Sequence, residues 1–191
     1  MKKILALGLV LLIAACGGAP RPPRNLDDAC AIIHERPKYY SAMRRAEARW
    51  GVPVAVQMAT IHQESKFDGN AKTPYRFALG VIPLGRQSSA YGYSQALDAT
   101  WEEYRKENGR YGAKRNRIFD ATDFMGWYMD GTTRQLGISK SDARNQYLAY
   151  HEGRGGFSRG SHRSKTWLMA VANRVAARAQ MYQIQLESCR R

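Results

Sequence analysis

The sequence predicts an all-α domain that carries a small β element. Hydrophobic residues make up 44% of the 191-residue chain, which is enough to fill a core. In the stretches that we assign to helices, apolar residues recur at helical spacing. Glycine and proline turn signals gather instead in residues 66–93. We therefore expect a single helical domain with a hairpin or an irregular loop in that stretch.

The first fifteen residues have the pattern of an export signal. Two lysines are followed by an apolar run, residues 4–15, that is too short to span a bilayer as a mature helix. The run ends in Leu12-Ile13-Ala14-Ala15-Cys16, which resembles a bacterial lipobox. We therefore expect cleavage after residue 15 and attachment of lipid to Cys16, which anchors the chain to a membrane.

Residues 16–26 are expected to form a tether between this lipid and the folded domain. The segment is rich in proline, which favours an extended chain. Gly17 follows the lipidated cysteine, and by resemblance to enterobacterial sorting it favours the outer membrane, facing the periplasm. The domain then occupies residues 27–191. The remaining two cysteines, Cys30 and Cys189, lie near its ends and are expected to pair in that oxidising compartment.

The helices expected in the first half of the domain flank the turn-rich stretch. Residues 39–50 are rich in good helix formers, and Gly51 ends them. Pro53 suits the start of the next helix, in which Val54, Met58 and Ile61 form one buried stripe up to about Ser65. Residues 77–83 could form a short strand or a hairpin. A loop as long as residues 66–93 is usually functional in a compact domain.

Four further helices are expected in the second half. Thr100 and Glu103 fit a capping box, and Gly109 ends that helix. The others are predicted from residue 120 or 122 to 136, from 141 to 150 and from 164 to 186.

Glu64 is the candidate catalytic residue. It lies at the end of an apolar helix, just before the long loop. Burial and the negative end of the helix dipole both disfavour its carboxylate, and burial is the larger effect. A carboxyl that stays protonated near neutral pH can protonate a leaving oxygen, as cleavage of a glycosidic bond requires.

Two other segments carry side chains that suit sugar binding. The first contains Gly92, where the backbone can approach a ligand closely. Its tyrosines offer flat faces to sugar rings, and its serine and glutamine offer hydrogen bonds to hydroxyl and acetamido groups. The second is a helix end that runs into a glycine-rich turn. The candidate residues of the two segments are Tyr91, Tyr93, Ser94 and Gln95, and Tyr150, His151 and Glu152.

In this order and spacing, the three segments resemble the lytic transglycosylases of the soluble-lytic-transglycosylase type, which have a lysozyme-like domain. That family carries E-S, then G-L-M-Q, then A-Y-N-x-G. Glu64-Ser65 matches the first motif fully. Residues 92–95 keep only the glycine and glutamine of the second, and residues 149–153 keep the alanine, tyrosine and glycine of the third, with His151 in place of asparagine. The resemblance extends from about residue 43 to 175, and the departures affect subsite contacts more than the reaction.

The resemblance implies cleavage of the β-1,4 bond between N-acetylmuramic acid and N-acetylglucosamine in peptidoglycan. Glu64 would protonate the glycosidic oxygen and then take the proton of the muramoyl C6 hydroxyl, which closes a 1,6-anhydro ring. Ser65 would orient Glu64, Gln95 would bind the acetamido sugar, and Tyr150 would position the carboxyl or the sugar. No second carboxylate is obligatory, because the nucleophile belongs to the substrate.

The sequence is also compatible with two other functions. A hydrolysing muramidase of the same fold would need a second carboxylate, for which Glu152, Asp68 and Asp98 are candidates. A non-catalytic lipoprotein could bind glycan through a basic surface, because the formal net charge is +14. Nucleic-acid binding conflicts with export, and no recognition motif is present. The scattered histidines and cysteines have no metal-ligand spacing, so we expect no metal or cofactor, and we expect a monomer.

Overall fold

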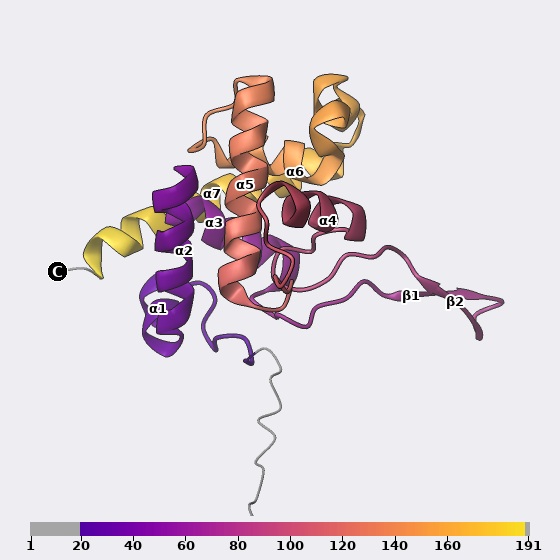
Figure 1. Ribbon diagram of the computed structural model, residues 1–191, viewed down its shortest axis with the longest axis horizontal. Coiled ribbons are helices and arrows are strands. Elements are labelled where there is room, and N and C mark those ends of the chain that lie inside the picture. Colours follow the sequence, from indigo (N-terminus) through magenta and orange to yellow (C-terminus); the bar gives the residue numbers. More distant parts are fainter. Residues whose placement is uncertain (1–19, 190–191) are drawn as a thin grey trace, which may run out of the picture.

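The computed structural model describes residues 20–189 as a mostly helical domain with one hairpin, which confirms the predicted fold class (Figure 1). The expected signal peptide at residues 1–15 and the lipidated Cys16 lie outside the described residues. The helices in chain order are α1 (Ala29–Glu35), α2 (Pro37–Trp50), α3 (Val54–Ser65), α4 (Asp98–Glu107), α5 (Ile118–Leu136), α6 (Ala143–Ser158) and α7 (Thr166–Ser188), with a 3-10 turn at Ser161–Ser164. No helix in the described part of the chain is long and apolar enough to cross a membrane.

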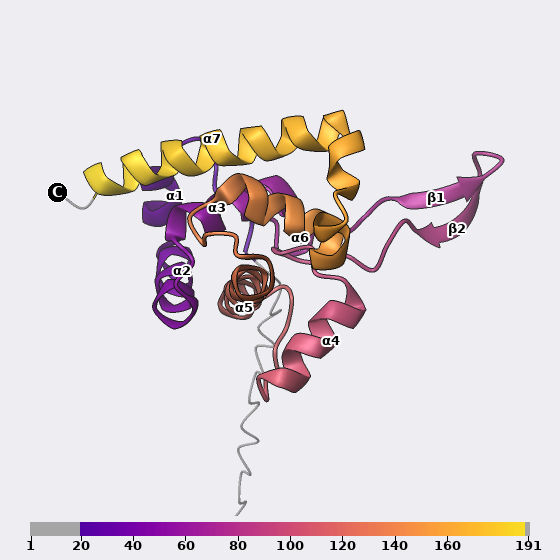
Figure 2. The ribbon, with the colours of Figure 1, turned by 90° about the horizontal axis from the view of Figure 1, so that it is seen from above.

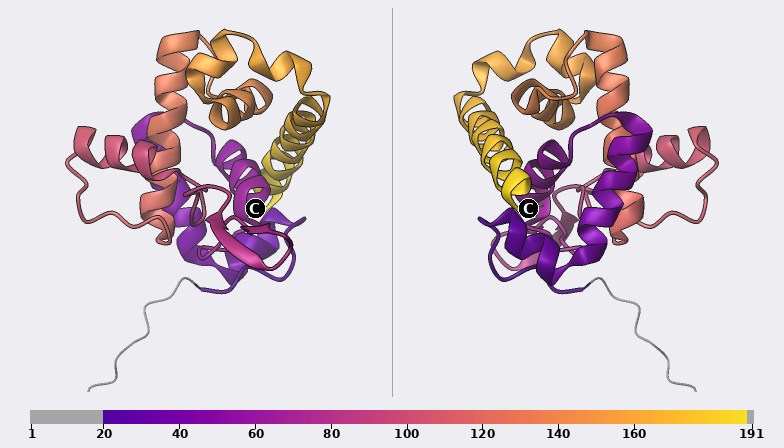
Figure 3. Two further views of the ribbon diagram at one scale, coloured as in Figure 1. Left: turned by 90° about the vertical axis from the view of Figure 1, so that its right-hand side faces the viewer. Right: turned by 90° about the vertical axis from the view of Figure 1, so that its left-hand side faces the viewer.

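Helix α3 is the centre of the core. Its residues from Val54 to His62 are all buried, so the helix is enclosed on every side and not only along the predicted stripe. It packs against α7, α6 and α2, and α2 packs in turn against α5 (Figures 2 and 3). The helix ends because Lys66 adopts a left-handed conformation, with φ of 52°. This end of α3 is where Glu64 lies.

A second cluster, made of aromatic rings, joins α4 to α5. Tyr104 of α4 is fully buried, and its hydroxyl donates a hydrogen bond of 2.6 Å to Asp123 of α5. Asp123 also accepts from the Trp50 indole at 3.0 Å, so it links α2 to this cluster. The rings of the cluster are those of Trp101, Tyr104, Phe124, Trp127 and Tyr128.

The two ends of the domain are joined as the sequence predicted. Cys30 and Cys189 form a disulfide, with their Cα atoms 5.6 Å apart. The Ala29 amide donates to the Gln185 side chain at 2.8 Å, and the Tyr182 hydroxyl donates to the Leu26 carbonyl. These contacts hold α1, which the sequence analysis did not predict, against α7.

Two local predictions are wrong. Helix α4 begins at Asp98 with Leu97 as its N-cap, and no side chain caps it, so Thr100 and Glu103 do not form a capping box. The glycine-rich residues 154–157 are helical and do not form the predicted turn, although the helix that carries Tyr150 is interrupted at Gly153, close to its predicted end. The helix accommodates a kink at Gly153, whose φ of 74° and ψ of 153° are not helical and are accessible to glycine.

The β element lies inside the turn-rich stretch, as expected. Strands β1 (Tyr75–Ala78) and β2 (Ile82–Arg86) form an antiparallel hairpin with a bulge after Arg76. The hairpin packs against no helix of the described chain and projects away from the domain (Figures 1 and 2).

Candidate active site

The Glu64 carboxyl lies in the last turn of α3, where it faces tyrosines of α6. Burial raises the pKa of this carboxyl from 4.5 to about 7, and a hydrogen bond from the Tyr147 hydroxyl opposes the rise. No lysine or arginine forms an ion pair with Glu64 in the described residues. A carboxyl with this pKa is present in both protonation states near neutral pH, so it can donate a proton and later accept one.

Tyr147 is the site residue that the sequence analysis missed. Its pKa is raised well above the ordinary value, first by burial and then by the negative charge of Glu64, to which it is hydrogen-bonded. Tyr147 precedes Tyr150 by three residues, so both rings lie on one face of α6. Burial likewise raises the pKa of Tyr150, and Glu64 is the next cause. Tyr147 could have been identified from the sequence, because a residue three positions before Tyr150 lies on the same face of a helix.

Ser65 fixes the end of α3 instead of contacting the Glu64 carboxyl. Its hydroxyl donates to the Tyr93 carbonyl at 2.9 Å and to the Ile61 carbonyl at 3.2 Å. The first bond joins the end of α3 to the loop that carries the second motif. Ser65 therefore holds in place the backbone next to Glu64.

The segment from Tyr91 to Gln95 is more buried than its sequence indicates. Tyr93 is fully buried, with its hydroxyl 3.0 Å from that of Tyr39, so it has no open face for a sugar ring, contrary to our expectation. Ser94 is also fully buried, and its hydroxyl has no hydrogen-bond partner within residues 20–189. Tyr91 is partly exposed, and the cations of Lys72 and Arg115 lie over its ring.

Residue 92 must be glycine because another part of the backbone passes close to it. Its φ is +79°, and a Cβ there would lie 2.2 Å from the Arg115 carbonyl oxygen. The close approach that we expected toward a ligand is therefore made toward residue 115. Gln95, with φ of 48°, donates from its side-chain amide to the carbonyls of Ala71 at 3.0 Å and Gly92 at 2.9 Å.

The Glu152 carboxylate, beside the kink of α6, is held by an ion pair. Lys165 lies 2.8 and 2.9 Å from its two oxygens, and the Ser161 hydroxyl donates to it. The Lys165 and Ser161 hydrogen bonds lower its pKa to about 2. The neighbouring His151 contacts Glu152 at 3.1 Å and packs edge-on against Trp167.

A hollow of about 220 Å³ brings together the second and third motifs. It is lined by Gln95, Ala96, Leu97, Thr100, Phe124, Tyr128, Tyr150, His151, Glu152 and Gly153. The Tyr150 hydroxyl donates to the Ser94 carbonyl at 2.6 Å and so joins α6 to the loop. Tyr150 lines this hollow, and the negative charge of Glu64 helps to raise its pKa. Tyr150 is therefore close to both the hollow and the acid. The mixture of aromatic and polar groups in the hollow suits a sugar.

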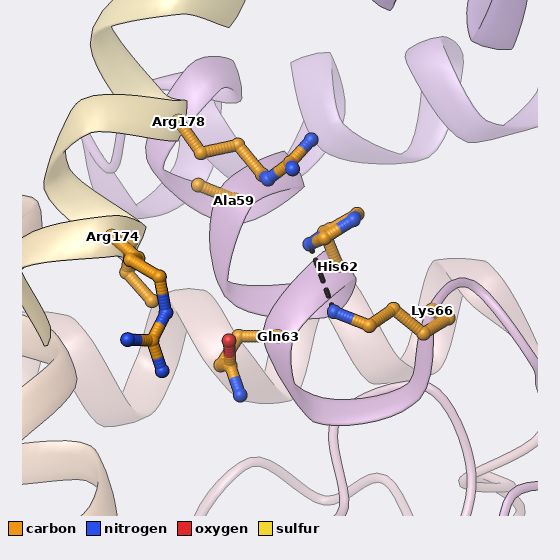
Figure 4. A pocket seen from close by; sticks show the side chains of 7 residues that line it. Ala59, His62, Gln63, Lys66, Arg174 and Arg178 are labelled. Atoms are coloured by element: carbon orange, nitrogen blue, oxygen red, sulfur yellow. Dashed lines mark hydrogen bonds between the residues drawn. The ribbon is translucent and has the colours of Figure 1, made fainter. Parts of the chain in front are cut away.

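A smaller cationic hollow of about 170 Å³ lies between α3 and α7 (Figure 4). Its lining includes His62, Gln63, Lys66, Arg174 and Arg178. Lys66 donates to His62 at 3.2 Å, while Arg174 has no hydrogen-bond or ion-pair partner in the described residues. The positive charge of Arg174 also acts on Tyr147, so this hollow is electrostatically connected to the site.

A hollow of about 830 Å³ between α2 and the start of α5 is a separate feature. Its Asp120 carboxylate pairs with Arg110 at 3.0 Å. None of the predicted motifs lines this hollow except through Tyr93.

Comparison with known proteins identifies the family. A search of curated proteins finds no match. The family model described as the transglycosylase SLT domain matches residues 4–189, which is nearly the whole chain. The chain therefore belongs to the transglycosylase SLT domain family, the lytic transglycosylases that its three motifs resemble.

Proposed function

We propose that this protein cleaves the β-1,4 bond between N-acetylmuramic acid and N-acetylglucosamine and leaves 1,6-anhydromuramoyl ends. Membership of the SLT family supports an enzyme that acts on peptidoglycan glycan strands. The observation that carries the finer proposal is the partly buried Glu64 carboxyl, which lies against tyrosines and has a pKa raised to about 7. Such an acid can hold a proton for the leaving group in a neutral compartment.

In the proposed reaction, Glu64 acts twice. As the acid, it donates its proton to the glycosidic oxygen while the bond from C1 of the muramoyl residue to that oxygen breaks. As the carboxylate, it then accepts the proton of the muramoyl C6 hydroxyl, whose oxygen bonds to C1. The proton that Glu64 lost is thereby restored. No water is consumed, and the intramolecular hydroxyl already lies close to the carbon that it attacks.

The other candidate carboxylates support this single-acid reaction over hydrolysis. Glu152 is paired with Lys165, and Asp98 is paired with Arg115 at 2.7 Å. Asp68 accepts a hydrogen bond from the backbone amide of Asn70 at 2.8 Å. A hydrolysing muramidase would need one of these groups to activate water, and two of the three are committed to cations.

The hollow lined by Gln95, Tyr150 and His151 is the proposed sugar-binding region. The Gln95 amide nitrogen is engaged by backbone carbonyls, so its carbonyl oxygen is the atom that we assign to the acetamido N–H of the substrate. Tyr150 would position Glu64 and the sugar together. Ser65 would act through the backbone, and Tyr91 is the tyrosine of its segment that could stack on a sugar ring.

We further propose that the protein works in the cell envelope. The lipobox-like segment supports a lipid anchor on Cys16, and Gly17 supports the outer membrane, facing the periplasm. The formal charge of +14 suits an anionic polymer such as peptidoglycan, whose stem peptides carry carboxylates. We propose that the protein acts as a monomer and without a cofactor.

Digestion of purified sacculi, followed by mass analysis of the released muropeptides, tests the proposal. Anhydro products, each one water lighter than the corresponding reducing ends, are expected. Reducing ends alone would identify a muramidase. A folded protein that releases nothing, while a control muramidase digests the same sacculi, would indicate a glycan-binding lipoprotein.

A further inference from the structure

The hairpin of β1 and β2 is an apolar arm that the proposed function leaves unused. Six of the eleven large hydrophobic side chains exposed in the described chain belong to it: Tyr75, Phe77, Leu79, Val81, Ile82 and Leu84. At the tip, Leu79 is 91% exposed and Val81 is 75% exposed. Since the hairpin packs against no helix, these side chains do not serve the core (Figure 1). A concentration of exposed apolar groups of this kind marks an interaction site.

Apolar side chains occupy both faces of the hairpin. Tyr75 and Phe77 lie on one face, with their ring centroids 6.4 Å apart. Ile82 is paired with Ala78, so it lies on the opposite face. Leu79 and Val81 belong to the turn. A docked protein would cover mainly one face, whereas a lipid environment surrounds an inserted arm on all sides.

Positive charge, without negative charge, accompanies these apolar groups. Residues 69–97 contain Lys72, Arg76 and Arg86 but no aspartate or glutamate. The Arg86 guanidinium lies over the Tyr75 ring, 4.3 Å from its centroid, at the base of the hairpin. Arg76, directly across from Gly85, is exposed and has no partner in the described residues. An apolar tip above a cationic base complements an anionic lipid surface, in which acyl chains lie beneath charged head groups.

We propose that this hairpin inserts its tip into the surface of an anionic phospholipid bilayer. The strands contain four and five residues, far fewer than the roughly 9–11 residues of a membrane-spanning strand. Their outer edges also have unpaired backbone groups, which are excluded from the hydrocarbon centre. Insertion is therefore shallow, at the level of the head groups and the first acyl carbons.

Insertion would orient the candidate active site relative to the membrane. The segments that lead into and out of the hairpin begin directly after Glu64-Ser65 and end at the loop of Tyr91–Gln95. The bridge between Lys72 and Tyr91 ties these two segments together. A membrane-docked hairpin thus restricts how the hollow is oriented relative to the bilayer surface. This second contact does not depend on lipid at Cys16.

A fluorescent label at the tip tests the proposal. In a full-length Cys16→Ser chain, the disulfide occupies the other cysteines, so Leu79→Cys supplies a single free thiol for an environment-sensitive dye. Phosphatidylglycerol vesicles should shift its emission to the blue, and lipids brominated near the head group should quench it. Ile184→Cys is the matched control, because Ile184 is 62% exposed on α7, and its label should do neither. The label reports local insertion even where the N-terminal apolar run holds the chain to the vesicle.

A charge variant and three contrary outcomes complete the test. Arg76→Glu in the Leu79→Cys chain should reduce insertion about fivefold or more, because each basic group near an anionic surface contributes about that factor. An unchanged label on vesicles would overturn the proposal. So would a blue shift that appears without lipid, either on raising the protein concentration, which indicates a second copy, or on adding glycan strands. Activity on soluble glycan strands, measured on the same labelled chains, reports separately on the proposed function.

Discussion

Two glutamates of the motifs, Glu64 and Glu152, show how differently this fold treats the same side chain. Both start from a pKa of 4.5. Burial among tyrosines raises the pKa of Glu64 to about 7, whereas the Lys165 and Ser161 hydrogen bonds lower that of Glu152 to about 2. The end of α3 offers Glu64 one neutral donor, Tyr147. The region after the α6 kink offers Glu152 an ammonium ion and a hydroxyl within hydrogen-bond distance.

The difference teaches that exposure alone does not distinguish a catalytic carboxyl from a structural one. The Glu152 side chain is only 5% exposed, and it stays ionised because a cation accompanies it. Glu64 is partly buried and has no cation partner in the described residues, so desolvation favours its neutral form. This contrast supports the proposal that Glu64 transfers the proton and that Glu152 makes a structural contact.

Removing the two carboxylates separately should lower the rate of catalysis by very different amounts. Glu64→Gln should lower kcat by about a thousandfold or more, because general acid–base catalysis is worth about 10²- to 10⁴-fold per step and Glu64 serves two steps. Glu152→Gln should leave the rate within about tenfold, because the carboxylate is already neutralised by Lys165. Release of muropeptides from sacculi at saturating substrate measures both. Equal losses in the two variants would contradict the assignment.

The two carboxyls should also give the stability of the protein opposite pH dependences. A carboxyl with a raised pKa destabilises the fold increasingly as pH rises from 4.5 to about 7. For Glu64 the full effect above pH 7 is at most about 3 kcal/mol. Glu64→Gln should therefore be more stable than the parent at pH 8 and equal to it at pH 4. Urea unfolding at the two pH values measures the difference.

Glu152 should act in the other direction and at lower pH. Its depressed pKa stabilises the fold above pH 4.5, and this contribution is lost as pH falls toward 2. The parent should lose more stability over this range than Glu152→Gln, in which other carboxylates with lowered pKa values, such as Asp27 and Asp130, still titrate. A parent and a Glu152→Gln variant with the same pH dependence below 4.5 would show that the ion pair does not form.

Removing Lys165, the partner of Glu152, should lower the free energy of unfolding by less than the full pH effect of Glu64. Lys165→Met leaves the carboxylate without its cation, but the Lys165 side chain is 41% exposed and water screens the pair. A loss of about 1 kcal/mol is therefore expected. Combining Lys165→Met with Glu152→Gln should recover part of this loss, since no unpaired carboxylate remains. Additive losses would mean that the two side chains do not interact.

The fold class and the raised pKa of Glu64 could be predicted because they follow from local patterns, and the disulfide could be predicted because only two cysteines remain in the domain. Apolar spacing predicted α3, and the position of Glu64 at its end predicted a raised pKa. The sequence could not predict the contacts that distinguish the two glutamates. Lys165 is thirteen residues from Glu152, and Tyr147 meets Glu64 only after α6 has packed near α3. The role of Gly92 was likewise hidden, since its neighbour is the backbone of Arg115.

The smallest expected effect isolates the hydrogen bond that the Glu64 carboxyl receives from Tyr147. Tyr147→Phe removes the donor that lowers the pKa of Glu64, so this pKa should rise above 7. Because the reaction begins with protonated Glu64, the alkaline limb of the profile of kcat/KM against pH should move upward by about one pH unit or less. Tyr150→Phe is the matched control, since its hydroxyl donates to the Ser94 carbonyl and not to Glu64. A limb that moves downward in Tyr147→Phe, or moves equally in both variants, would show that the Tyr147 hydroxyl does not stabilise the ionised acid.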